Sequence, residues 1–277
     1  MSEQQLPTVP PASPVDRIDT SKPHPARVYD WFLGGKDNYL VDEELGSRIA
    51  AIAPDVKRFA CQNRWFMHRV VRRLSGEGGV RQFLDIGSGI PTEPNLHQIA
   101  QGAAPGVRVV YVDNDPIVLA HSEALLDGTP EGVTRYFEAD VREPERILEL
   151  ASHVIDFGQP VALSLIALLH FVGDDDGAYD LVARLVAGLP SGSCLALSQL
   201  TDDFDAENVG KGVASYASSG VPLVPRSHAG VSRFFEGLEL VDPGVVSLSD
   251  WHPELALRHM PAETGPVPLY GGVGRKP

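Results

Sequence analysis

Five short apolar runs rich in β-branched residues alternate with segments of helical spacing, and this alternation constrains the fold more than any other feature. The runs are residues 80–86, 107–112, 133–139, 161–169 and 194–200, and the helical segments between them are 95–101, 116–126, 144–155 and 176–189. Strands that are apolar at nearly every position are covered on both faces. The pattern therefore predicts an α/β fold with a doubly wound, mostly parallel sheet and helices on both of its faces.

The two ends of the chain depart from this alternation. Residues 1–20 are rich in proline and predict a disordered arm. Residues 21–79 predict an N-terminal helical cover, and residues 80–277 predict the ligand-binding sheet domain. The helices of the cover are expected at 26–33, 42–52 and 55–74. Strand-like stretches at 238–241, 245–248 and 267–270 have no helix of comparable length between them, which predicts an antiparallel strand at the C-terminal edge.

Charge and cysteine content narrow the class of protein. The formal net charge is −14, so the overall field repels phosphate backbones and nucleic acid is not the expected partner. Cys61 and Cys194 lie far apart in apolar stretches, which excludes a disulfide framework and a thiolate zinc site, and the histidines show no metal-ligand spacing. The longest apolar run, 161–169, is too short to cross a bilayer. We expect a cytoplasmic protein without a metal or a membrane partner, and the oligomeric state stays open.

The first strand runs through Asp85 into a Gly-Ser-Gly turn at 87–89. In a doubly wound sheet, ligands bind beyond the carboxyl ends of the strands, and glycines there let a ligand approach the backbone. A dinucleotide site would need a third glycine, at the position of Thr92, to hold a helix N-terminus against the pyrophosphate. The turn therefore favours a nucleoside site over a dinucleotide site.

The next two strands also end in carboxylates. Asp113 follows the strand at 107–112, where it can accept both hydroxyl protons of a ribose. Asp115 directly precedes a proline and is better suited to cap the helix that follows. Asp140 follows the strand at 133–139, where an acceptor suits the exocyclic amine of adenine. Together with Asp85, these acids predict one rim of a nucleoside pocket.

The glycine turn and these acids resemble the glycine loop, ribose acid and adenine acid of class I S-adenosylmethionine-dependent methyltransferases. More narrowly, residues 20–255 resemble a bacterial family of such enzymes with largely unassigned substrates. The matching stretches are ARVYD at 26–30, LGGKDN at 33–38, and residues 83–91, 109–116, 169–171 and 192–195. The resemblance implies a seven-stranded Rossmann-like sheet, S-adenosylmethionine as the cofactor, and a small-molecule methyl acceptor.

The resemblance also implies which residues contact the methyl donor. Residues 34–38 lie between two helices with hinge glycines, and are a candidate lid in which Lys36 would neutralise the donor's carboxylate and Asn38 would bond its polar end. A plain turn with a solvated lysine is the alternative. The expected donor contacts are Asp85, Gly87, Ser88, Gly89, Asp113, Asn114, Asp140, Val141, Leu169, Gly35, Lys36 and Asn38.

Catalysis by such an enzyme needs alignment more than a strong base, because a sulfonium is already a good leaving system. The catalytic candidates are His170 and Tyr29, with Asp30 as a further candidate base, and His170 is equally well explained as a strand-end residue that bonds backbone. The chain lacks the Asp/Asn-Pro-Pro-aromatic segment of amino-methylating enzymes, which favours oxygen, sulfur or carbon acceptors over planar amines. The alternatives are a non-catalytic module that binds S-adenosylmethionine or S-adenosylhomocysteine and, less favoured, an NAD(P)-dependent oxidoreductase.

Two other stretches have more than one interpretation. Residues 201–225 follow the fifth strand, where an insertion would lie over the mouth of the pocket and shape acceptor choice, although a flexible loop is equally compatible. The basic run 57–81 could hold RNA or a phosphorylated substrate, but a solvated face paired with acids is favoured.

Overall fold

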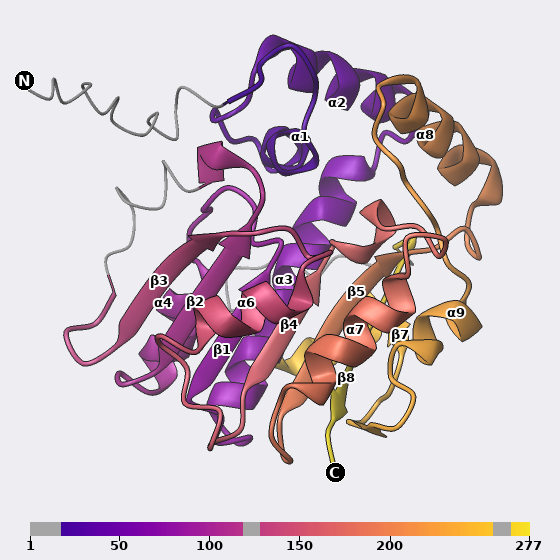
Figure 1. Cartoon of the computed structure of the whole chain (residues 1–277). Coiled ribbons are helices and arrows are strands. Elements are labelled where there is room, and N and C mark those ends of the chain that lie inside the picture. Colours follow the sequence, from indigo (N-terminus) through magenta and orange to yellow (C-terminus); the bar gives the residue numbers. More distant parts are fainter. Residues whose placement is uncertain (1–17, 119–127, 257–266) are drawn as a thin grey trace, which may run out of the picture.

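The computed structural model describes residues 18–118, 128–256 and 267–277 (Figure 1). Within these residues, eight strands form one sheet in the order β3-β2-β1-β4-β5-β8-β6, and β7 also pairs with β8. The strands are β1 (Gln82–Ile86), β2 (Arg108–Asp113), β3 (Val133–Glu138), β4 (Ala162–Ile166), β5 (Cys194–Leu200), β6 (Glu239–Leu240), β7 (Val246–Ser247) and β8 (Leu269–Arg275).

Strands β1 to β5 run parallel, and β8 is antiparallel to β5. The predicted mostly parallel sheet with an antiparallel C-terminal strand is therefore confirmed. Strand β8 is not the outermost strand of the sheet, because β6 and β7 pair with opposite ends of it. These two short strands share one edge position, which reconciles eight strands with the seven that the sequence predicts.

Helices cover both faces of the sheet. One face packs on α6 (Pro144–Ala151), α7 (Ala178–Ala187) and α9 (His228–Arg233), and the other on α3 (Val56–Ser75) and α4 (Leu96–Ala103). Each face has its own apolar cluster: Leu163 and Leu185 belong to the first, and Phe66 and Val109 to the second. The strands are buried on both sides, as their continuous apolar sequence requires.

A third apolar cluster lies apart from the sheet and joins the N-terminal helices to a helix from the second half of the chain. It includes Val28 and Phe32 of α1 (Pro25–Phe32), Leu45 of α2 (Leu40–Ile52) and Tyr216 of α8 (Ala206–Ser218). Figure 1 shows these three helices together beyond one end of the sheet. We call α1, α2 and α8 the cap layer.

Helix α3 belongs to both parts of the molecule, because Ala60 near its start joins the cap-layer cluster and Leu74 near its end packs on the sheet. The division of the chain into a cover at 21–79 and a domain at 80–277 therefore stays a prediction. The predicted arm at 1–20 lies almost wholly outside the described residues. The predicted helix at 116–126 begins at Pro116, and its remainder beyond Val118 also lies outside them.

Two expectations from the sequence need correction. Residues 201–225 contain the helix α8, whose N-cap Asp205 accepts a hydrogen bond from the Asn208 amide. The apolar run 161–169 stops as a strand at Ile166, because Ala167 has a positive φ of 54° that turns the chain into the 3₁₀ helix η2 (Leu169–Phe171). This turn brings His170 to the end of the sheet rather than continuing β4.

The arginines of the basic run mainly hold neighbouring loops. Arg69 is buried and donates to the carbonyls of Leu248, in η3 (Leu248–Asp250), and Trp251 at 2.5 and 2.7 Å. Arg72 donates to the Leu255 carbonyl at the end of η4 (Pro253–Leu255) at 2.7 Å. Their partners are backbone oxygens, and these contacts fasten the segment after β7 to α3. The expected pairing with acids is found for Arg58 with Asp55 and for Arg73 with Glu77.

Candidate active site

A cavity of about 650 Å³ lies at the carboxyl ends of the central strands. Its floor is formed by the ends of β1, β2, β3 and β4, and its roof by residues of the cap layer and the segment 220–223. The parallel register places Asp85 of β1 beside Tyr111 of β2 and Ser164 of β4, so the strand ends reach the same edge. The stretch after β5, expected over the pocket mouth, is confirmed in that place.

The glycine turn forms one wall of the cavity with its backbone. Gly87 and Gly89 have φ values of 71° and 66°, and the Gly87 amide donates to the Val112 carbonyl at 2.8 Å. A Cβ atom at Gly87 would lie 2.6 Å from Leu168 Cδ1, whereas one at Gly89 would meet no atom within 4 Å. Ser88 Oγ is buried and has no hydrogen-bond partner among the described residues. A bare backbone cradle with an unpartnered hydroxyl fits a polar ligand.

The turn does not lead directly into a helix. Helix α4 begins only at Leu96, after the N-cap Asn95, whose backbone amide donates to the side-chain oxygen of Gln98. A helix N-terminus is therefore not presented to the turn as a pyrophosphate site requires. The geometry agrees with the nucleoside site that the missing third glycine indicates.

Asp113 lies buried at the end of β2 with its carboxylate beside the turn. It accepts hydrogen bonds from the Gly89 amide at 2.8 Å and the Asp115 amide at 3.0 Å, one on each oxygen. Burial raises the pKa of Asp113 above its ordinary value, although the two amide hydrogen bonds act in the opposite direction. Each carboxylate oxygen has a second lone pair, so the fixed group retains acceptor capacity for a ribose.

Asp140 lines the same cavity after the end of β3, and its carboxylate pairs with the guanidinium of Arg142. Its carboxylate accepts from the Asn114 side chain at 3.1 Å and from both the amide and the guanidinium of Arg142, the latter at 3.2 Å. Burial raises the pKa of Asp140, but these hydrogen bonds outweigh it and the pKa is lowered overall. Sequence reasoning missed Arg142, which also lines the cavity with Val141.

Asp85 in the cavity wall has a strongly raised pKa. Burial raises its pKa to about 6, although Ser164 and the charge of Arg64 act to lower it, and the charge of Asp113 adds to the increase. Such a carboxylate favours a cation as its partner, because a nearby positive charge restores the ionised form.

We expect the Asp85→Asn variant to remove a pH-dependent loss of stability. The unfolded carboxyl releases its proton near 3.8 while the folded one holds it to about 6, so wild-type stability falls across this range and stays low above it. The free energy of unfolding of the variant relative to wild type should rise by about 2 kcal/mol between pH 4 and 7.

Urea unfolding at several pH values measures this difference. The control is Asp156→Asn, because hydrogen bonds from Gly158 and Gln159 lower the pKa of the exposed Asp156. Its stability relative to wild type should therefore fall, not rise, as the pH increases. A difference for Asp85→Asn that stays constant with pH would show that Asp85 is not held protonated.

His170 lines the cavity, and the structure gives it little strength as a base. Burial, together with the charge of Arg226, lowers its pKa to about 3, so the imidazole is neutral at physiological pH. Its Nδ1 atom is buried and has no hydrogen-bond partner within the described chain. The ring is therefore placed to exchange one hydrogen bond with a ligand.

Tyr29 also lines the cavity, but its hydroxyl is already engaged. It donates to the Ala60 carbonyl and accepts from the Asn63 side chain, both at 2.9 Å, and burial raises its pKa to about 12. Asp30, the third candidate base, accepts from the Asn38 side chain at 2.8 Å and from the Asp37 amide at 3.0 Å. Tyr29 therefore joins α1 to α3, and Asp30 holds the turn between α1 and α2.

Four of the expected donor contacts are not brought to the cavity wall. Gly35 and Lys36 are exposed, and Asn38 donates back to Asp30 and to the Gly35 carbonyl, so the segment closes on itself as a turn. Leu169 is fully buried, and its carbonyl accepts from the Arg226 guanidinium at 2.8 Å. The remaining eight expected contacts all line the cavity: Asp85, Gly87, Ser88, Gly89, Asp113, Asn114, Asp140 and Val141.

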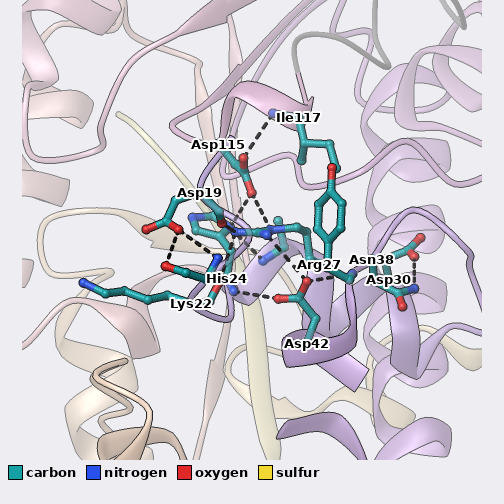
Figure 2. A network of polar contacts seen from close by, with 12 residues as sticks. Asp19, Lys22, His24, Arg27, Asp30, Asn38, Asp42, Asp115 and Ile117 are labelled. Carbon is teal, nitrogen blue, oxygen red and sulfur yellow. Dashed lines mark hydrogen bonds and ion pairs between the residues drawn. The ribbon is translucent and has the colours of Figure 1, made fainter. Parts of the chain in front are cut away.

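A buried polar network fastens the cap layer to the end of β2. The Arg27 guanidinium of α1 donates to Asp115 at 3.1 Å and lies 3.6 Å from Asp42 of α2. His24 Nδ1 lies 3.0 Å from the same Asp115 carboxylate, whose other oxygen accepts from the Ile117 amide. Figure 2 shows Arg27 between the two carboxylates. Asp115 therefore caps its helix, as predicted, and also anchors the N-terminal helices.

The sheet order, the antiparallel C-terminal strand, and a cavity with a glycine cradle and strand-end acids define a Rossmann-like, S-adenosylmethionine-dependent methyltransferase. The chain belongs to the S-adenosyl methyltransferase family, whose model matches residues 11–277. The glycine cradle and acceptor oxygens described above fit the nucleoside part of this cofactor. The alternative of an NAD(P)-dependent oxidoreductase is supported neither by the family nor by the turn.

Solved structures agree with this assignment. A DUF574 family protein from Streptomyces avermitilis has 48% identity and a TM-score of 0.88, over 94% of this chain and 100% of that one. A candidate methyltransferase from Thermobifida fusca has 39% identity and a TM-score of 0.85, over 97% and 99%. An S-adenosylmethionine-dependent methyltransferase from Anabaena variabilis, at 15% identity and a TM-score of 0.51, shares the fold. No curated protein matches the chain.

Within the described residues, no helix is both long and apolar enough to span a membrane, and no group of three or more metal-ligating side chains is found.

Proposed function

We propose that this methyltransferase acts on a small, largely apolar molecule at an oxygen, sulfur or carbon atom. The observation that carries the proposal is that one cavity joins the glycine cradle to an apolar chamber under the cap layer. The chamber walls include Ile49, Val56, Phe171, Tyr216, Val221 and Leu223, which pack in the cap-layer cluster. A chamber enclosed by helices suits a small molecule better than a macromolecule.

The residues of the cavity have distinct proposed roles. Gly87, Ser88 and Gly89 would approach the donor with their backbone, Asp113 would bind its ribose, and Asp140 with Asn114 and Val141 would face its adenine. When bound, the cofactor supplies a methyl group on a positively charged sulfur. The protein's part is to hold the acceptor in line and exclude competing water.

His170 is proposed to position the acceptor rather than to take its proton. Its neutral ring has a buried, partnerless Nδ1 in the cavity wall and a pKa of about 3, which makes it a weak base. An acceptor that is already nucleophilic at neutral pH needs no more than this. Planar amines are less favoured, because the segment after the fourth strand is Leu168-Leu169-His170-Phe171 and lacks the amino-methylating sequence.

Binding experiments test the donor assignment. S-adenosylhomocysteine at about 100 times its dissociation constant should stabilise the protein by about 2.7 kcal/mol, whereas NADH should not. Transfer of a labelled methyl group is then measured with a panel of apolar phenols, thiols, carboxylic acids and planar amines. Transfer confined to planar amines or to nucleic acid would contradict the proposed acceptor class, and binding without any transfer would favour the non-catalytic module.

The chamber itself is tested by filling it. Gly212 of α8 lines the cavity and a Cβ atom there would meet no atom within 4 Å, so the Gly212→Leu side chain should occupy acceptor space. We expect the KM for the acceptor to rise about tenfold or more, since lost burial of a few methylene groups is worth ~2 kcal/mol. The affinity for S-adenosylhomocysteine should stay unchanged.

Gly210→Leu is the matched control, because Gly210 is on the same helix, also has open space at its Cβ, and is not part of the cavity wall. Both variants gain helix propensity equally. Equal acceptor KM values for the two variants would show that the chamber does not hold the acceptor.

We propose that the protein works in the cytoplasm without a nucleic-acid partner. The net charge of −14 opposes binding to a phosphate backbone and so supports the absence of a nucleic-acid partner. So does the use of Arg69 and Arg72 in holding loops rather than presenting a free basic face.

A further inference from the structure

A series of buried hydrogen bonds connects the cap layer to the turn that follows β4. The Tyr29 hydroxyl of α1 accepts from the Asn63 side chain of α3 at 2.9 Å. The oxygen of the same Asn63 amide group accepts from the Ser198 hydroxyl of β5, and that hydroxyl accepts from the backbone amide of Ala167 at 2.9 Å. Asn63 and Ser198 are almost fully buried, so these side chains meet one another rather than water. We call Tyr29, Asn63 and Ser198 the polar bridge.

Ala167 is the point at which the backbone needs such a partner. Its φ of 54° is a left-handed conformation, which is unfavourable for a residue that has a Cβ atom. Strained residues of this kind persist where surrounding contacts hold them, and they gather at functional sites. The Ser198 hydroxyl binds the amide of Ala167, and Ala167 itself lines the cavity. The polar bridge therefore holds the start of the turn that carries His170.

Other contacts fix the two sides of this connection. Arg226 donates to the Leu169 carbonyl at 2.8 Å, which holds the turn at a point beyond Ala167. Helix α3 is fixed beside Asn63, because the guanidinium of the next residue, Arg64, donates to two backbone carbonyls of residues 92–94. The polar bridge thus joins a fixed helix to the strained start of the turn.

We propose that Asn63 and Ser198 are positioning residues for methyl transfer, which hold the left-handed turn at Ala167 and thereby place His170 against the acceptor. This inference rests on the role proposed above for His170. The two residues act through His170 rather than on the acceptor, because their polar groups are already engaged with each other and with Tyr29 and Ala167. Tyr29 extends the same connection to α1 of the cap layer.

Nuclear magnetic resonance of the His170 ring tests the proposal without any ligand. Protein labelled with carbon-13 at the histidine Cε1 atoms gives one signal for each histidine, and that of His170 is identified by its loss in His170→Gln. In Ser198→Ala the Ala167 amide loses its partner, so the His170 signal should move or double at pH 7. Adding Ala167→Gly, which adopts the left-handed conformation without strain, should return the signal toward its wild-type position.

Ser193→Ala is the matched control. Ser193 is buried directly before β5, and its hydroxyl accepts from the amide of Val161, directly before β4, at 3.0 Å. The control variant therefore loses the same kind of bond at the opposite end of the same two strands, and its His170 signal should stay in place. An unchanged signal in Ser198→Ala, or an equal change in Ser193→Ala, overturns the proposal. Thermal unfolding of each variant establishes that the proteins compared are folded.

The part played by Asn63 is tested with Asn63→Leu. This variant should move the His170 signal as Ser198→Ala does, and the double variant should move it no further, because both substitutions break the same bridge. Changes that simply add would show that the two residues act separately, and would remove Asn63 from the proposal.

Methyl transfer to an acceptor found in the panel above gives a second readout. Ser198→Ala should lower kcat/KM for the acceptor about five- to tenfold, which corresponds to one hydrogen bond. In a His170→Gln background the same substitution should have little further effect, since the residue that it positions is gone. An equal loss in both backgrounds would show that Ser198 supports only the fold. If no acceptor is methylated, the proposed function fails, whereas the His170 signals still decide whether the polar bridge places this ring.

Discussion

The Asp113→Asn variant is expected to bind S-adenosylhomocysteine about 100-fold more weakly than the wild type. The carboxylate is held by the Gly89 and Asp115 amides and has acceptor capacity for two ribose hydroxyls. Hydrogen bonds to a charged group contribute roughly 1.5–3 kcal/mol each, and each 1.4 kcal/mol is about tenfold in affinity. Asparagine has one acceptor oxygen in place of two, and its amide group would face a backbone amide donor.

Calorimetric titration measures this loss, and adenosine serves as a second ligand that retains the ribose. Affinity for adenosine should fall in parallel, because the ribose is common to both. Asp55→Asn is the control, since Asp55 lines the cavity but is largely exposed and paired with Arg58. An Asp113→Asn protein that binds both ligands within threefold of wild type would place the ribose elsewhere.

The second large effect is expected from Gly89→Ala, which should abolish donor binding while costing little more stability than a control. Gly89 and Gly79 both have a φ of 66°, and a Cβ atom at either would meet nothing within 4 Å. Each alanine variant should therefore lose about 1–2 kcal/mol of stability from its left-handed backbone. Only at Gly89 would the added methyl group enter the space where a ligand approaches the backbone.

Urea unfolding and calorimetry of the pair separate the two effects. Similar free energies of unfolding are expected for Gly89→Ala and Gly79→Ala, with donor binding retained only in the latter. Gly87→Ala should be the least stable of the three, because its Cβ would overlap Leu168. Normal donor affinity in Gly89→Ala would contradict the close approach of the ligand at this position.

The central sheet could be predicted from the sequence because its signals are local. Continuous apolar runs bounded by glycine and acidic residues mark β1 to β5, and Asp85, Asp113 and Asp140 end their strands in the predicted order. Parallel strands bring such ends to one edge wherever the intervening helices pack. The proposed donor site rests on that geometry.

The acceptor half could not be predicted in this way, because it depends on contacts between distant segments. Helix α8 has glycines at 210 and 212 and no leucine, isoleucine or methionine, so its own sequence favours a loop, and it is packing on α2 through Tyr216 that supports it. The left-handed Ala167, which brings His170 to the cavity, has no sequence signal. Arg64 lies in a basic run whose partners are carbonyls, which a sequence does not reveal.

The Asp115 contacts link Asp113 at the end of β2 to the N-terminal helix α1. Its amide donates to Asp113 while its carboxylate contacts His24 and Arg27, so the residue proposed to bind the ribose and the attachment of α1 both depend on Asp115. If donor binding stabilises these contacts, then by thermodynamic reciprocity the attachment of α1 strengthens donor binding by the same factor. On that coupling, an acceptor that displaced α1 on entering the cavity would weaken donor binding, and so would loss of the Arg27 contact with Asp115.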